Sequence, residues 1–442
     1  MSSNTAQAAL TPGFASSPGT WQVPLLAATF FLLSADLANF TVAGFKLKYG
    51  YILVIGLWTT APAKMASLVA GAARRIPWAY GLPLLPLAIS IATSANVRNS
   101  LAWTCWLGFD AFTLATVYAF LKAHAFLGDD VRRALTWSLA MVAAAGVVQF
   151  LAIYGWHRPL LSPQLHFGIY RLNGVSGWPH FLNIFAFLML PLVVVQRRLS
   201  WTVKGVLTIL LFVLVQSTAK TGWILFVAFG ALLLLFDRRV FVRNYLLFLL
   251  PVTLVLLTIP LPSATQGAPP LSGATKMEQF SADLDVTDKR TSGTDRVLVN
   301  LMGLHVWWRH PWFGVGPRAY DNYVRSRFDA ELPGVNKLDA NGNVNSKSEN
   351  IWIELLSECG LLFTLAFAAV LFHALRVPRF AFANRLHLGA WIALVMYFCI
   401  SGQVSQNALL TMVYATFGCY LYARELSGEA DIPPARLASD AA

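Results

Sequence analysis

The chain has 442 residues, of which 57% are hydrophobic and only 12% are charged, and its mean hydropathy is +0.57. A soluble domain averages about 45–50% apolar and about 25% charged residues, so this composition excludes an ordinary soluble fold. Apolar runs of about twenty residues, long enough to cross about 30 Å of hydrocarbon, recur along the chain. We therefore predict an all-α integral membrane protein. A β-barrel would show short alternating segments instead.

The formal net charge is +12, from 33 Lys and Arg against 21 Asp and Glu. In a polytopic membrane protein such an excess marks cytoplasmic loops, so we expect no nucleic-acid binding. The four cysteines lie in apolar segments without metal-ligand spacing, which predicts neither a disulfide nor a metal cluster. Residues 1–20 contain no Lys or Arg, so the basic region of a cleaved signal peptide is missing and the first apolar run is expected to remain as a span.

About twelve transmembrane spans are predicted. Residues 1–20 form a cytoplasmic tail, and spans 1 to 9 lie within residues 21–260. A large, partly helical periplasmic loop occupies residues 261–350, spans 10 to 12 lie within residues 351–425, and residues 426–442 form a second cytoplasmic tail. The individual spans are placed at residues 22–40, 49–70, 78–96, 100–121, 134–154, 179–196, 202–218, 221–236, 244–260, 351–375, 386–402 and 405–423.

Basic residues in the connections fix the orientation. With a cytoplasmic N-terminus, the inner loops hold more than twice as many Lys and Arg as the four short outer loops. This is the positive-inside pattern, and it places the long loop outside. The second span is the least regular of the twelve, because Pro62 and Lys64 interrupt it.

The long loop carries most of the candidate chemistry. Apolar positions at three- and four-residue spacing within residues 297–306 predict an amphipathic helix capped by Ser292 or Thr294. Arg296 then falls in its first turn, where a cation opposes the helix dipole unless an anion compensates. A bound anion would meet free N–H groups and the guanidinium together. The alternative is a surface arginine paired with Asp295 or another acid of the loop.

Two further cations stand in short outer turns. Lys220 lies in the segment Gln216–Gly222 between two apolar spans, and Arg171 lies in the segment Tyr170–Gly174. Each is either an interfacial side chain that keeps its charge in water or a fixed positive charge beside a lipid phosphate.

Carboxylates stand at the start of the tenth span. Ser348 is its predicted N-cap, which places Glu349 in the first helical turn, where the dipole favours an ionised carboxylate. Glu349 is either a general base or an ordinary N-terminal acid. Glu358 lies about 13 Å further along a helix that rises 1.5 Å per residue. A carboxylate at that depth is costly unless paired. We therefore expect Glu358 to support the site from below, against a basic residue.

Taken together, these segments resemble the O-antigen ligase and polymerase superfamily of polytopic membrane glycosyltransferases. The segment from Arg171 to Pro179 has an arginine, a glycine and a proline before an apolar span, like one landmark of that family. The segment from Ser217 to Gly222 resembles the family's Ser-Arg-Gly turn, with Lys220 where arginine is usual.

The second half of the resemblance lies around the long loop. Arg296, followed by the segment His310–Gly316, resembles the stretch after the family's second key arginine. The motif that opens the tenth span is matched by Asn350, Leu356, Glu358 and Gly360.

One position departs from the family, which usually has a histidine, its proposed base, where this chain has Glu349. Either Glu349 replaces that histidine, or His180 or His310 supplies its function. We expect His310, Gly314 and Gly316 to give structural support. The missing histidine favours a relative that polymerises or transfers another surface polysaccharide over a lipopolysaccharide ligase.

The resemblance implies glycosyl transfer from an undecaprenyl-pyrophosphate-linked glycan to a glycan or lipid A-core acceptor, at the periplasmic face of a bacterial inner membrane. Lys220 and Arg296 are expected to stabilise the diphosphate, and Glu349 to act as base opposite the leaving group, with inversion. We expect the remaining substrate contacts from Arg171, Arg318, His180 and Asn350.

No cofactor is expected, and no acidic cluster suits a divalent ion, so the transfer is predicted to be metal-independent. Membrane lipids and a chain-length regulator are the expected partners. The competing hypothesis is a transporter or flippase of lipid-linked sugars, which would share the spans and the basic site but line a path through the bilayer with charge. A non-catalytic assembly partner of a synthase is a third possibility.

Overall fold

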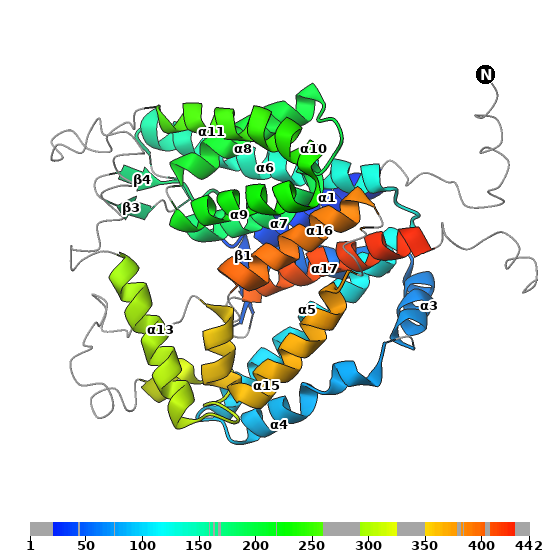
Figure 1. Cartoon of the computed structure of the whole chain (residues 1–442), viewed down its shortest axis with the longest axis vertical. Helices are drawn as coiled ribbons and strands as arrows, with labels where there is room; N and C mark the ends of the chain where they lie inside the picture. Colours follow the sequence, from blue (N-terminus) through cyan, green and yellow to red (C-terminus); the bar gives the residue numbers. More distant parts are fainter. Residues whose placement is uncertain are drawn as a thin grey trace, which may run out of the picture.

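The fold was obtained as a computed structural model, shown in Figure 1. It is built almost entirely of helices, which confirms the all-α class. The residues that it describes are 21–42, 45–74, 76–158, 160–161, 164–166, 169–217, 219–259, 292–324, 350–377, 382, 384–402 and 407–428.

Two short antiparallel hairpins interrupt the helices. Strand β1 (Asn39–Val42) pairs with β2 (Phe45–Lys48), and β3 (Gln164–His166) pairs with β4 (Ile169–Arg171). The helices of the first half are α1 (Gln22–Ser34), α2 (Tyr49–Thr59), α3 (Pro62–Ala73), η1 (Trp78–Gly81), α4 (Leu84–Ala92), α5 (Val97–Ala123) and α6 (Gly128–Tyr154).

The second half is also helical. Its elements are α7 (Pro179–Val194), α8 (Trp201–Gln216), α9 (Lys220–Phe236), α10 (Arg238–Val240), the π-helix η2 (Phe241–Leu249), α11 (Leu250–Leu257), α13 (Ser292–Arg309), α15 (Ile351–Leu375), α16 (Arg385–Met396), the π-helix η4 (Tyr397–Ser401) and α17 (Asn407–Gly428).

Helix α7 forms the centre of the bundle. It is apolar on all sides and buried along nearly its whole length, as expected for a helix surrounded by others. It packs on α6, α9, α16 and α17. At Gly389 of α16 an added Cβ would lie 2.8 Å from the Cα of Leu192, so glycine allows α16 to approach α7 this closely.

Four helices within the described residues are long and apolar enough to cross a membrane, namely α5, α6, the run Arg238–Leu257 and α15. The pair α2 and α3 gives a fifth if it counts as one span, bent by 94°. Pro62, at the start of α3, explains this break, since it has no N–H to continue α2. The other apolar helices are shorter. The chain therefore has the helices of a multi-pass membrane protein. The count of twelve crossings stays a prediction.

The predicted span at 78–96 is not one continuous helix. It is divided into η1 and α4, with Pro83 as the residue before α4. Pro83 has no backbone N–H to donate, so the regular hydrogen-bond pattern is interrupted where the two helices meet.

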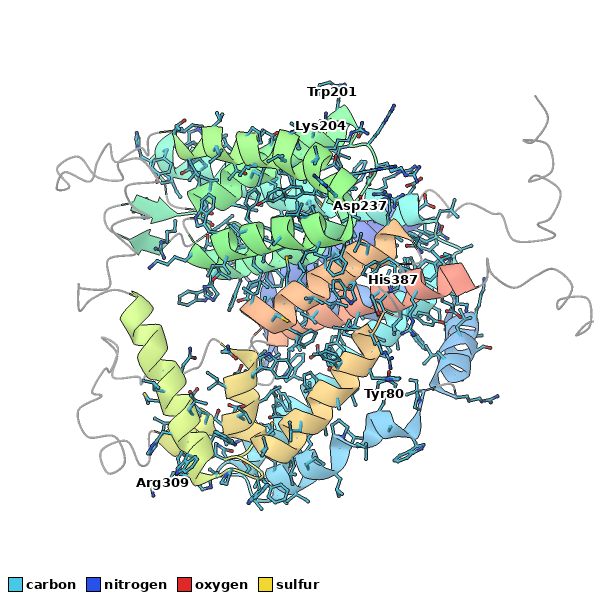
Figure 2. The ribbon with its side chains drawn as sticks, viewed as in Figure 1. Tyr80, Trp201, Lys204, Asp237, Arg309 and His387 are labelled. Carbon is cyan, nitrogen blue, oxygen red and sulfur yellow. The ribbon has the colours of Figure 1, made fainter. Side chains whose placement is uncertain are left out.

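An ion pair and a cation–π contact lie at one end of the bundle. Arg385, at the start of α16, lies 3.0 Å from Asp237, at the end of α9. Lys204 stands over the Trp201 ring at 4.5 Å, and Figure 2 places Trp201, Lys204 and Asp237 toward one side of the molecule. We call this the basic end. The opposite end, which holds the β3–β4 hairpin, the α8–α9 turn and the start of α7, is the hairpin end (Figure 1).

Candidate functional site

Buried amides fix the turn that follows Arg171. Arg171 ends β4, and Gln149 of α6 accepts hydrogen bonds from the N–H groups of Asn173, at 3.0 Å, and Gly174, at 2.8 Å. The Gln149 amide also donates to Asn173 Oδ1 at 2.5 Å. Asn173 donates in turn to the Gly177 carbonyl at 2.8 Å. Gln149 and Asn173 are fully buried, so the direction in which the chain leaves Arg171 depends on this small network.

Lys220 is the first residue of α9, directly after the α8–α9 turn. Asn183 of α7 donates to Ser217 Oγ at 2.7 Å, which fixes that turn against the central helix. A Cβ on Gly222 would lie 2.0 Å from Asn183 Oδ1, so only glycine lets α9 begin this close to α7. A cation at a helix N-terminus opposes the helix dipole. A bound anion would compensate both the charge of Lys220 and the positive end of the dipole.

The two cation-bearing turns adjoin each other. The N–H of Leu172 points at the Gln216 carbonyl at 3.5 Å, which joins the residue after Arg171 to the end of α8. His180 lies in the first turn of α7, and its ring meets Phe181 edge-on with centroids 4.2 Å apart. The structure thus brings Arg171, His180 and Lys220 to the hairpin end.

Asn350 begins α15. Its side chain accepts hydrogen bonds from the N–H groups of Trp352, at 3.0 Å, and Ile353, at 3.3 Å. The prediction of Ser348 as N-cap is therefore wrong, because the side-chain oxygen of Asn350 accepts from the free N–H groups at the start of the helix, two and three residues after it. Glu349 precedes the cap instead of lying in the first turn, and its own position falls outside the described residues.

Helix α15 is broken at Gly360, which has a φ of +77° and a ψ of 177°. Figure 1 shows the two pieces of α15 meeting at an angle. The segment His310–Arg318 docks on this break through backbone hydrogen bonds. Leu361 donates to the Pro311 carbonyl at 2.8 Å, and Val315 donates to the Ser357 carbonyl at 3.0 Å.

Three glycines with positive φ make this docking possible. A Cβ on Gly314 would lie 2.4 Å from the Glu358 carbonyl carbon, and one on Gly360 would lie 2.3 Å from the Trp312 carbonyl oxygen. At Gly316 it would lie 2.0 Å from Ser94 Oγ. Other side chains have no room there, and their backbones rarely adopt this region.

Glu358 holds the end of this segment. Its Oε2 accepts the backbone N–H of Arg318 at 2.8 Å, and the Glu358 side chain is almost completely buried. Arg318 has a φ of +59°, an uncommon conformation for a residue with a side chain. Burial and the nearby negative charges of Asp321 and Glu358 raise the pKa of Tyr320 well above its usual value. The Glu358 carboxylate therefore meets the backbone N–H of Arg318, and its pairing with a basic side chain stays a prediction.

The aromatic residues after Arg318 close a small core. His310 Nε2 lies 3.0 Å from Tyr323 Oη, with the two rings edge-on. Ser100 Oγ of α5 donates to the Pro317 carbonyl at 2.7 Å, and Ala95 donates to the Val315 carbonyl at 2.9 Å. The segment therefore lies between α15 and the start of α5.

Residues 205–368 match the family model described as O-antigen ligase. This stretch is similar to the O-antigen ligase family. This confirms the resemblance to the O-antigen ligase superfamily and implies glycosyl transfer of the ligase or polymerase type in general. No curated protein matches the chain.

The matched stretch, residues 205–368, contains most of the predicted site. Lys220, Arg296, Arg318, Glu349 and Glu358 lie within it, and the turn at Arg171 precedes it. The backbone of Arg296 lies near the start of α13, whose first helical residue is Ser292, and the residue that caps this helix stays a prediction. The side chain of Arg296, like all of Glu349, lies outside the described part of the structure.

Sequence reasoning missed an ion pair beside the turn that follows Arg171. Lys48 lies 3.0 Å from Asp36 and is almost completely buried. Burial lowers the pKa of Lys48, and the charge of Asp36 opposes that change. Leu37, next to Asp36, donates to the Val175 carbonyl at 3.0 Å, so the pair supports the turn after Arg171. The only sequence signal was an acid and a base on either side of a short hairpin.

Proposed function

We propose that the chain transfers a glycan from an undecaprenyl-pyrophosphate donor to a sugar hydroxyl of a glycan or lipid A-core acceptor, at the periplasmic face of the bacterial inner membrane. The observation that carries the proposal is the O-antigen ligase match over residues 205–368. The matched stretch includes Lys220 at the start of α9, Arg296 in α13 and Arg318 after α13. The transfer is independent of metal ions and inverts the donor carbon. The long loop between residues 261 and 350 is periplasmic, and twelve spans frame it.

The contacts between connecting segments support this topology. Segments assigned to the outside contact one another, as Leu172 contacts Gln216 and Ala95 contacts Val315. Segments assigned to the inside do the same, as Asp237 contacts Arg385. The hairpin end then faces the periplasm and the basic end the cytoplasm, in agreement with the positive-inside rule.

The cations have one chemical task in this proposal. The diphosphate gains charge as it becomes the leaving group, and positive groups already in place stabilise that charge in the transition state. Lys220, at the N-terminus of α9, and Arg296, in the first turns of α13, are assigned to the diphosphate. Arg171 and Arg318 assist them, and His180 and Asn350 contact the substrates.

The reaction is a single displacement. The acceptor hydroxyl attacks the anomeric carbon, its oxygen forms the new glycosidic bond, and the bond from that carbon to the diphosphate breaks. Glu349 takes the hydroxyl proton, and undecaprenyl pyrophosphate leaves with the bonding electrons. The base stands opposite the leaving group, so the anomeric configuration inverts.

The cations are tested with purified protein, lipid-linked donor and acceptor, following glycan product and released undecaprenyl pyrophosphate. Lys220→Ala and Arg296→Ala should each lower turnover by about 10²–10³, the usual effect of losing one such donor. Lys220→Arg should retain partial activity. Lys204→Ala, at the basic end, is the matched control and should react normally. Normal turnover by both alanine variants would place the diphosphate elsewhere, and donor translocation without product would favour the flippase alternative.

The base is tested by Glu349→Gln, which keeps the shape of the side chain but cannot accept a proton. It should bind donor and turn it over about 10²–10⁴ more slowly. Glu331→Gln makes the same chemical change elsewhere in the loop and should leave turnover unchanged. Near-normal turnover by Glu349→Gln would show that another residue is the base, with His180 the first to examine.

A further inference from the structure

Helix α13 has apolar side chains on two opposite faces. The inward face is covered, because Met302 and Val306 are buried in the small core that also contains Val315, Tyr320, Tyr323 and Val324. The outward face is uncovered, with Leu301 56%, Leu304 37% and Trp308 76% exposed. Each contributes to a patch that a helix in water would fill with polar residues.

The exposed residues form one stripe. Leu301, Leu304 and Trp308 are three and four residues apart, and Trp312, four residues further on in the turn after α13, is 56% exposed. Residues at this spacing lie above one another on a helix surface. Contiguous exposed apolar patches mark a surface that meets a partner or a membrane.

The stripe continues into a surface that faces lipid. The N–H of Leu362 in α15 points at the Trp312 carbonyl at 3.4 Å, which places the end of the stripe beside the second piece of α15. There Leu362 is 42% and Leu365 58% exposed. Helix α15 is one of the helices long and apolar enough to cross a membrane, so its exposed leucines meet acyl chains.

The direction of α13 fits the same environment. In Figure 1 α13 runs steeply across the direction of α8, α9 and α11, so it lies along the membrane plane if those helices cross it. Tryptophan is enriched where acyl chains meet headgroups, because its ring is apolar and its N–H is polar. Arg309, next to Trp308, is exposed and lies at the far end of α13 in Figure 2, where its cation can reach phosphate groups.

We propose that Leu301, Leu304, Trp308 and Trp312 are seated in the membrane surface, so that α13 is an interfacial helix. The turn that ends at Arg318 follows α13 directly and is fixed to α15 by Glu358. Seating α13 at the boundary therefore sets the height of Arg318 relative to the lipid headgroups. The inference needs only a membrane-inserted chain. It does not depend on glycosyl transfer.

Spin labels test the seating in the full chain reconstituted in phospholipid nanodiscs. Cysteines are placed singly at Leu301, Leu304 and Trp308, after the exposed Cys105 and Cys399 are replaced by serine. The reference positions are Leu247, 69% exposed on η2, for lipid, and Asp129, whose side chain is 81% exposed, for water. Collision rates with oxygen, which concentrates in lipid, and with a water-soluble nickel chelate are measured at each label.

The expected ratio of oxygen to nickel collisions at positions 304 and 308 is severalfold above that at position 129 and below that at position 247, as at the headgroup boundary. A ratio equal to that at position 129 would show a stripe in water and overturn the proposal. Low collision rates with both reagents would show a stripe covered by protein, either a segment of this chain or a second copy, and would also overturn it. Three label positions protect the result against one poorly folded variant.

Two substitutions at Trp308 test the seating independently of the proposed reaction. Trp308→Glu places a charge in the stripe, whereas Trp308→Phe keeps it apolar. The oxygen-to-nickel ratio at position 304 should fall severalfold in Trp308→Glu and stay unchanged in Trp308→Phe. This readout needs no donor or acceptor, so it remains valid if the chain proves not to transfer sugars. An unchanged ratio in both variants would contradict the seating.

Discussion

The turns at the hairpin end and the segment His310–Arg318 both present cations, but they are fixed in different ways. At the hairpin end, buried side-chain amides hold the backbone, as Gln149 holds the turn after Arg171. In the segment His310–Arg318, backbone holds backbone, with glycines at Gly314 and Gly360 where the two chains touch.

This difference predicts different tolerance to substitution. An amide network fails when an acceptor is removed, because buried N–H groups are then left without partners. A backbone-to-backbone contact fails when any atom is added, because there is no side chain that can move aside.

Gly360→Ala should have the largest effect. At a φ of +77° and a ψ of 177°, a region that only glycine adopts readily, an alanine is strained by about 1–3 kcal/mol. Its Cβ would lie 2.3 Å from the Trp312 carbonyl oxygen, which adds about 1–3 kcal/mol of overpacking. Thermal unfolding of the purified protein should show a loss of about 2–6 kcal/mol in the free energy of unfolding. Gly205→Ala, where a new Cβ meets nothing within 4 Å, is the control and should be neutral or slightly stabilising. A stable Gly360→Ala would mean that the break in α15 is not fixed by this contact.

Gln149→Leu should come second. It leaves the buried N–H groups of Asn173 and Gly174 without their acceptor, at about 1–3 kcal/mol each. The free energy of unfolding should fall by about 2–4 kcal/mol, as measured by chemical or thermal unfolding in detergent. Thr208→Val is the control, because its hydroxyl bonds to the Lys204 carbonyl in the same helix. Equal stability of the two variants would show that the turn after Arg171 does not depend on the amide network.

Much of the helical framework could be predicted from the sequence. Apolar run length alone placed a helix or a pair of helices at each of the twelve predicted spans, and it matched α15 at both ends. It could not give the number of membrane crossings, because α8 and α9 are shorter than a full span and α2 with α3 is bent. The bend at Pro62 was foreseeable, since proline cannot continue the hydrogen-bond pattern.

The candidate site could be predicted only in part. Arg171, Lys220 and Glu358 were found because a charge in or beside an apolar segment is unusual. Gln149 and Asn173 were missed, because an amide in a span looks the same whether it bonds to its own helix or to a turn far away in the sequence. The N-cap was misplaced by two residues because Ser348 and Asn350 are equally good caps by type, and only tertiary packing chooses between them.

Asn350→Ala should have a smaller effect. Loss of the N-cap of α15 costs about 1 kcal/mol. Ser200→Ala is a matched control, because Ser200 caps α8 in the same way, through the N–H of Val203. The two variants should lose similar stability in thermal unfolding, but only Asn350→Ala should lower turnover. Equal turnover would show that Asn350 is a cap without a role in binding substrate.

Arg318→Gly should change stability least. It removes the guanidinium but keeps the backbone conformation, so it separates the structural role of Arg318 from the role of its charge. Glycine adopts a φ of +59° without strain, and the N–H that donates to Glu358 is retained. The relief of strain and the greater freedom of the unfolded chain act in opposite directions, so the free energy of unfolding should change by less than about 1 kcal/mol.

If the guanidinium assists at the diphosphate, turnover should nevertheless fall by at least about tenfold, and Arg318→Lys should recover part of it, because a point charge replaces the fork of donors. The measurement is turnover against donor concentration at equal folded protein. Normal turnover by Arg318→Gly would leave Arg318 a purely structural residue and would confine the diphosphate contacts to the cations of α9, α13 and the turn at Arg171.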